Sequence, residues 1–166
     1  MAKANDLQYL MDRAAIRDLL ARYFQGLDSC SPEQVRSCFT DDIQAHYDQR
    51  PPTRGIEELM NSLQNFNKLR AGTMRVTTHF MGNLSFTLLK GDVAETETNA
   101  VAFLVEPEAG TDRVAMRSLR YLDRMRRQKD GWRISDRIHT LDWSCQVPTN
   151  FAITLARRVS VLPARS

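Results

Sequence analysis

The sequence predicts an α+β domain in which three N-terminal helices pack against a cone-shaped, curved antiparallel sheet and enclose a pocket. Two observations predict this class. As far as residue 69, apolar residues recur at intervals of three and four, which is typical of amphipathic helices. After Gly72 they alternate with polar residues over long segments joined by short turns, which is typical of an antiparallel meander. With 166 residues and 42% hydrophobic content, the chain can bury one core, which we expect within residues 1–143.

The first helix is expected over residues 6–27, with one buried stripe. The stripe consists of Leu10, Ile16, Leu19, Leu20, Tyr23 and Leu27. Gly26 is expected near the end of this helix, because glycine commonly terminates helices. Asp28 then falls in the exit turn, between two helix ends, where it can aim a carboxylate. Aspartate is common in turns, so a purely structural role for Asp28 is the alternative.

A second, short helix is expected from Ser31 to about residue 39. Ser31 suits the N-cap, Pro32 suits the first helical position, and Gln34 completes a capping-box pattern. A third helix is expected over residues 55–69, where a core-facing stripe recurs at helical spacing.

A short strand over residues 43–48 separates the second and third helices. Its alternation turns Ile43, Ala45 and Tyr47 towards the core. The other face, expected to be exposed, carries Gln44, His46 and Asp48, so His46 is only a weak candidate for a functional site.

The sheet is expected to start with one long strand over residues 75–89, interrupted by Gly82 at a bulge or bend. Further strands follow over residues 93–105, 114–126 and 132–143. In the last strand Trp132, Ile134 and Ile138 share one parity. Arg137 and His139 therefore point away from the core unless a bulge intervenes. Residues 144–166 are expected to form a tail that covers the pocket or contacts another subunit.

His79 is the only strongly chemical residue in the β-branched segment 76–83, and we expect it on the inner wall of the cavity. Histidine titrates near neutral pH, so in a cavity it can remove a proton from carbon and pass it to a leaving group. Strand histidines are also often structural, and that alternative stays open here.

Several segments, in this order and spacing, resemble the SnoaL-like branch of the nuclear-transport-factor-two-like superfamily. They are residues 13–19 with Tyr23 and Asp28, then 39–42, 78–83, 120–123 and 130–134. The superfamily includes scytalone dehydratase, lindane dehydrochlorinase, bile-acid 7α-dehydratase, polyketide cyclases and ketosteroid isomerase. It also includes noncatalytic members and small subunits of ring-hydroxylating dioxygenases.

The resemblance implies an Asp28–His79 pair, with Tyr23 and Tyr47 as further catalytic residues. Tyr121, Phe24, Met81 and Arg137 are the expected substrate-binding residues. The implied protein is a cofactor-independent lyase of the dehydratase type, or an isomerase, that abstracts a proton from a hydrophobic, polycyclic or steroid-like small molecule. The alternative is a noncatalytic ligand-binding or subunit-assembly domain of the same fold. The resemblance also implies a homodimer or homotrimer.

Other classes of function find little support in the sequence. The three histidines lack close metal-ligand spacing, no glycine-rich phosphate loop is present, and the basic run 124–129 lacks interleaved aromatics. We therefore expect no metal, no organic cofactor and no nucleic-acid partner. No apolar run reaches membrane-spanning length, and the odd number of cysteines favours a reduced, cytoplasmic protein. Cys30 could serve a Cys–His nucleophile, but it fits a small structural thiol better.

Overall fold

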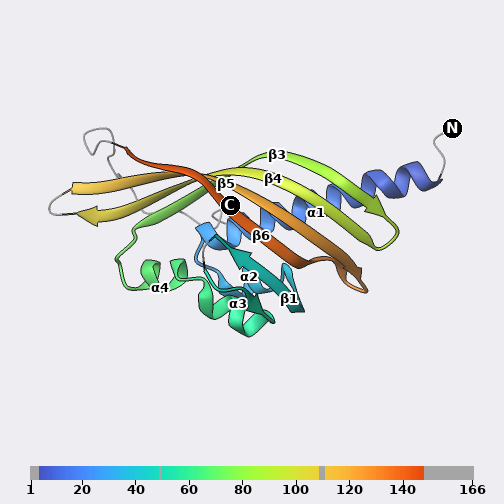
Figure 1. Cartoon of the computed structure of the whole chain (residues 1–166), viewed down its shortest axis with the longest axis horizontal. Coiled ribbons are helices and arrows are strands. Elements are labelled where there is room, and N and C mark those ends of the chain that lie inside the picture. The colour runs from blue at the N-terminus through green and yellow to red at the C-terminus, as the bar shows by residue number, and fades with distance from the viewer. Residues whose placement is uncertain (1–3, 49, 109–110, 148–166) are drawn as a thin grey trace, which may run out of the picture.

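The computed structural model describes residues 4–48, 50–108 and 111–147, and it confirms the α+β class (Figure 1). The first half of the chain contains α1 Ala4–Asp28, α2 Pro32–Arg36, β1 Phe39–Tyr47, β2 Thr53–Arg54, α3 Ile56–Ser62 and α4 Asn65–Arg70. The second half consists of the long strands β3 Val76–Lys90, β4 Val93–Glu108, β5 Thr111–Gln128 and β6 Gly131–Val147. No helix in the described ranges is both long and apolar enough to cross a membrane.

The strands form one curved sheet in the order β2-β1-β6-β5-β4-β3. Strands β3 to β6 make the expected antiparallel meander. The expectation of a wholly antiparallel sheet is corrected by β1, which pairs with β6 in parallel and with β2 antiparallel. Helix α1 lies along one face of the sheet, and its first turns extend beyond the sheet (Figure 1). Leu10, predicted to belong to the buried stripe, is in these turns and is exposed.

Helix α1 ends at Asp28, one residue beyond its predicted end, so Gly26 lies near the end as expected. Gly26 is itself helical, however, and is not the residue that terminates the helix. Two residues after the helix ends at Asp28, Cys30 adopts a left-handed φ of 54°. The N–H groups of Cys30 and Ser31 bond back to the carbonyls of Leu27 and Gly26, the pattern of a Schellman motif. Gly26 is needed for packing instead, because a Cβ there would lie 2.8 Å from Cγ2 of Val35. Asp28 is thereby fixed in the last helical turn.

The expected capping box is also wrong, because the side chain of Ser31 makes no capping hydrogen bond. Gln34 instead donates from Nε2 to the carbonyl of Arg22 at 2.9 Å, which ties α2 to α1. The predicted third helix is divided into α3 and α4 by Leu63, whose ψ of 80° is not helical. Apolar spacing is helical on both sides of this break, so periodicity alone did not reveal it.

Bulges decide which residues face the concave side of the sheet. The predicted bulge at Gly82 is confirmed by a register shift between Met81 and Leu84. A second bulge was not predicted: Met125 pairs with Ile134 and Arg124 with Asp136, which leaves Ser135 as an extra residue. The parity of β6 changes there, so Arg137 and His139 are buried, contrary to their predicted outward orientation.

Strand β6 continues to Val147, beyond its predicted end at residue 143, because it pairs with β5 as far as Val114. The rest of the predicted tail, residues 148–166, lies outside the described residues.

The core fills the space between α1 and the concave face of the sheet, where Ile16, Leu20 and Ile134 are fully buried. A buried ion pair crosses the base of this core. Arg137 donates to both carboxylate oxygens of Asp123 at 2.7 and 2.8 Å, with both side chains fully buried. The Arg137 guanidinium also lies 4.2 Å from the ring centre of Tyr23.

Candidate active site

Small residues in the middle of the sheet leave space on its concave face. His79 on β3 pairs with Ala102 on β4, which in turn pairs with Arg117 on β5. Directly opposed residues share one face of a sheet, so only a methyl group stands between the side chains of His79 and Arg117. Along β4, Ala100 occupies the next inward position, opposite Leu119.

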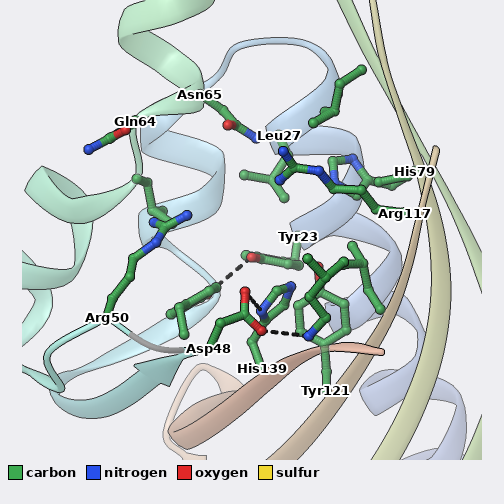
Figure 2. Close-up of a pocket in the computed structure, with 16 residues that line it drawn as sticks. Tyr23, Leu27, Asp48, Arg50, Gln64, Asn65, His79, Arg117, Tyr121 and His139 are labelled. Atoms are coloured by element: carbon green, nitrogen blue, oxygen red, sulfur yellow. Dashed lines mark hydrogen bonds and ion pairs between the residues drawn. The ribbon is translucent and has the colours of Figure 1, made fainter. Parts of the chain in front are cut away.

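This space is a pocket closed from the other side by α1, β1 and the segment between α3 and α4 (Figure 2). Its buried floor is formed by Tyr23, Leu27, Tyr47, Ala102, Leu119, Tyr121 and His139. Its more exposed rim contains Asp48, Arg50, Gln64, Asn65, Arg117 and Leu141. The volume open to the centre of a water molecule is about 70 Å³, which is room for a few waters or one small chemical group.

Asp28 and His79 meet through two contacts. Oδ1 of Asp28 lies 2.7 Å from Nδ1 of His79, and Oδ2 accepts the backbone N–H of His79 at 2.8 Å. The His79 side chain is 4% exposed, and Phe24 stacks on its ring. A carboxylate at Nδ1 favours the tautomer with the proton on that nitrogen. Nε2 makes no hydrogen bond to the described residues, and His79 lines the pocket, so this nitrogen then offers its lone pair there.

The predicted tyrosines lie in the same pocket. The hydroxyl oxygens of Tyr23 and Tyr47 are 3.2 Å apart and share a hydrogen bond. Tyr121 packs edge-on against Tyr23 and Phe24. Burial raises the pKa of Tyr23 and that of Tyr121 above their ordinary values, so both phenols stay protonated and can donate hydrogen bonds.

Three of the predicted substrate-binding residues do not line the pocket. Phe24 supports the rings of His79 and Tyr121 from behind. Met81 is partly buried and packs against the core. Arg137 lies beneath the floor, bound to Asp123 and covered by the rings of Tyr23 and Tyr121. His46, the weak candidate, is exposed on the outer face of β1.

A second aspartate–histidine pair, Asp48 and His139, was missed by the sequence prediction. His139 faces the pocket because of the bulge at Ser135. Asp48 follows the end of β1 and has a left-handed φ of 51°, which redirects its side chain towards the pocket. Its Oδ2 lies 3.3 Å from Nδ1 of His139. Its Oδ1 accepts the backbone N–H of Leu141 at 2.5 Å.

The imidazole of His139 is neutral in this setting. Burial lowers the pKa of His139 to about 4, although Asp48 opposes this effect, and the positive charges of Arg137 and Arg50 lower it further. Tyr47 stacks on the ring, and Tyr121 meets it edge-on. No residue pattern in the sequence signals this pair, because both members depend on local departures from strand geometry.

Arg50 and Arg117 also belong to the pocket and were not predicted. Arg117 could have been found from strand parity, because it shares its face of β5 with Leu119 and Tyr121. Within the described ranges, no group of three or more histidine, cysteine, aspartate or glutamate side chains is arranged to hold a metal ion.

The fold and this pocket define a class of protein, and the comparison with family models identifies it. The chain belongs to the SnoaL-like domain family, whose model matches residues 8–138. This confirms the resemblance found in the sequence. A search of curated protein sequences finds no match.

Solved structures show the same fold. A hexachlorocyclohexane dehydrochlorinase, LinA type 2, has a TM-score of 0.74 at 20% identity, covering 92% of this chain and 97% of its own. The type 3 enzyme of Novosphingobium barchaimii has a TM-score of 0.71 at 18% identity, covering 92% and 99%. A scytalone dehydratase-like protein of Novosphingobium aromaticivorans has a TM-score of 0.70 at 17% identity, covering 93% and 97%. The structural neighbours of this chain thus include lyases.

Proposed function

We propose that this protein is a cofactor-independent lyase of the dehydratase type, or an isomerase, that acts by removing a proton from carbon beside a carbonyl group. The observation that carries this proposal is the two-point contact of Asp28 with His79. It holds the imidazole in one orientation and presents the unprotonated Nε2 to an enclosed pocket.

In the proposed reaction Nε2 of His79 takes the proton, and Asp28 stabilises the resulting imidazolium. The electron pair moves to the carbonyl oxygen, where a hydroxyl of the Tyr23–Tyr47 pair donates a hydrogen bond to the enolate. In a dehydration, the enolate collapses to a carbon–carbon double bond, a hydroxyl group leaves, and the imidazolium returns its proton to form water. In an isomerisation, the same proton returns to a different carbon.

The size of the pocket limits the substrate. With about 70 Å³ open to water centres, a polycyclic or steroid-like molecule would have to extend through the rim. We therefore propose a compact substrate, with one ring or a short chain, whose reacting carbon lies between His79 and the tyrosine pair.

Deuterium exchange tests this reaction before the substrate is known. One-ring ketones and β-hydroxyketones are incubated with the protein in D₂O, and loss of the α-proton signal is followed by NMR. We expect exchange of at least one compound to fall about 100-fold or more in His79→Ala, and about 10-fold or more in Asp28→Asn.

The matched control is His46→Ala, because His46 is exposed on the outer face of β1 and lies outside the pocket. It should exchange at the wild-type rate. Exchange that persists in a folded His79→Ala protein would show that His79 is not the base. Binding without exchange by the wild type would favour the noncatalytic alternative.

A further inference from the structure

Arg117 differs from every other arginine on its strand. Strand β5 carries five more, at positions 113, 120, 124, 126 and 127, and each has a carboxylate oxygen within 3.7 Å. Arg117 has no carboxylate within ion-pair distance among the described residues, although it is partly buried. A partly desolvated guanidinium without a counterion is costly, and a bound anion would remove that cost.

The position of Arg117 directs it into the pocket. It shares a ladder row with Ala102 and His79, and Figure 2 shows Arg117 beside His79 at the sheet side of the pocket. Neighbouring strands are about 4.8 Å apart, so the two backbones stand about 10 Å apart with the Ala102 methyl between them. A small molecule above Ala102 would meet the imidazole at one end and the guanidinium at the other.

The charge balance of the lining favours the same ligand. Arg50 faces Arg117 across the pocket (Figure 2). Among the described residues its side chain makes one hydrogen bond, from Nη1 to the carbonyl of Ser62 at 3.4 Å. The described lining contains one acidic side chain, Asp48. Its Oδ1 accepts the backbone N–H of Leu141, and its Oδ2 lies 3.3 Å from Nδ1 of His139. Two cations and one carboxylate therefore face the space, and the lining carries a net positive charge.

We propose that Arg117 is a specificity-determining residue that binds a carboxylate group of the substrate. This assignment rests on the proposed function, because it places that carboxylate at the opposite end of the substrate from the carbon that His79 deprotonates. The planar fork of a guanidinium matches the two oxygens of a carboxylate, and Arg50 at the rim adds a second positive charge. The preferred substrate is then a compact oxo or hydroxy acid rather than an uncharged hydrophobic molecule.

The test compares benzoate with benzamide, which has the same shape and no charge. Binding is measured by ligand-observed NMR titration of the full chain. We expect wild type to bind benzoate about 10-fold or more tightly than benzamide, and Arg117→Gln to lose this preference. Arg117→Lys should keep part of it. Arg120→Gln is the matched control, because Arg120 is on the same strand but pairs with Glu97 and Asp142, and it should keep the full preference.

An equal affinity of wild type for benzoate and benzamide would overturn the proposal, as would an unchanged preference in Arg117→Gln. Tighter binding of phenylphosphonate than of benzoate would overturn the assignment to a carboxylate. His79→Ala should keep the preference for benzoate. Failure of the anion site is thus distinguishable from failure of the proposed reaction, which deuterium exchange reports separately.

Discussion

His79 and His139 both line the pocket, and each lies within reach of an aspartate. Their surroundings differ at the level of single atoms. Asp28 accepts two hydrogen bonds from His79, one from the ring and one from the backbone. Asp48 contacts the His139 ring only at 3.3 Å and without the alignment of a hydrogen bond, because its other oxygen is held by Leu141. His79 is therefore oriented as a base, whereas His139 is a neutral, buried imidazole.

The low pKa of His139 predicts a measurable effect on stability. In the unfolded chain, His139 binds a proton below its ordinary pKa of 6.5. In the folded chain it binds that proton only below about pH 4. The free energy of unfolding should therefore fall as pH is lowered from 6.5 to 4, by up to about 3 kcal/mol from this residue. Urea denaturation at pH 7, 5.5 and 4 measures this loss.

His139→Gln should remove that part of the pH dependence, since glutamine does not titrate. The control is His46→Gln, which changes an exposed histidine and should keep the wild-type dependence. The same pH dependence in His139→Gln as in wild type would contradict the explanation.

Among single residues, those whose position followed from regular geometry were predicted. Tyr23 lies on the buried stripe of a helix and Tyr47 follows strand alternation, whereas Tyr121 was expected from the family resemblance. All three line the pocket. His139 was missed because one extra residue, Ser135, reverses the alternation before it. Asp48 was missed because its left-handed backbone conformation returns its side chain to the face opposite to that expected.

At the level of elements, β5 and β6 are joined beneath the pocket by Arg137 and Asp123, which have no solvent exposure. Burial alone would lower the pKa of Arg137, but the Asp123 carboxylate raises it well above its ordinary value, so the pair is ionised. Removal of one charge would leave the other buried without compensation.

We therefore expect Asp123→Asn, which nearly preserves volume, to lower the free energy of unfolding by about 3–5 kcal/mol. The matched control is Glu95→Gln, which breaks the exposed ion pair with Arg124 and should cost less than about 1 kcal/mol. Urea denaturation of both variants tests the difference. Equal stabilities would mean that the buried pair contributes little.

The order of elements was predicted more accurately than their ends and partners. The four long strands and their turns follow from alternation and glycine positions, which are local signals. The parallel pairing of β1 with β6 joins segments more than 80 residues apart, and no local pattern specifies such a contact. The end of α1 was predicted to within one residue, although Cys30, rather than a glycine, adopts the left-handed conformation after it.

On the scale of the whole molecule, the outer face of the sheet carries exposed apolar side chains. Phe80, Val101, Ser118 and Trp143 form one ladder row, in which Phe80 is 61% and Trp143 50% exposed. Ile138, on the same face, is 49% exposed. Exposed rows of this kind are suited to pairing between subunits, and we propose this face as the contact of a homodimer or homotrimer.

Phe80→Lys and Trp143→Lys should each shift the protein towards monomer in light-scattering measurements of mass, because a buried lysine opposes association. The control is Leu7→Lys on α1, which changes an equally exposed leucine away from the sheet. A wild-type protein that is monomeric at all concentrations would contradict the proposed contact.

The extra residue at Ser135 makes the chemistry of the pocket depend on the number of residues in β6 as well as on their identity. If β6 paired with β5 by plain alternation with Ser135 retained, Arg137 and His139 would turn to the outer surface and Ile138 would come inside. Deletion of Ser135 would instead remove the bulge and leave these three residues on their present faces. Loss of the bulge without loss of a residue would thus exchange a cation and an imidazole for an aliphatic side chain on the inner face. Relatives of this protein are therefore best compared by strand length between Gly131 and Val147 before individual positions are aligned.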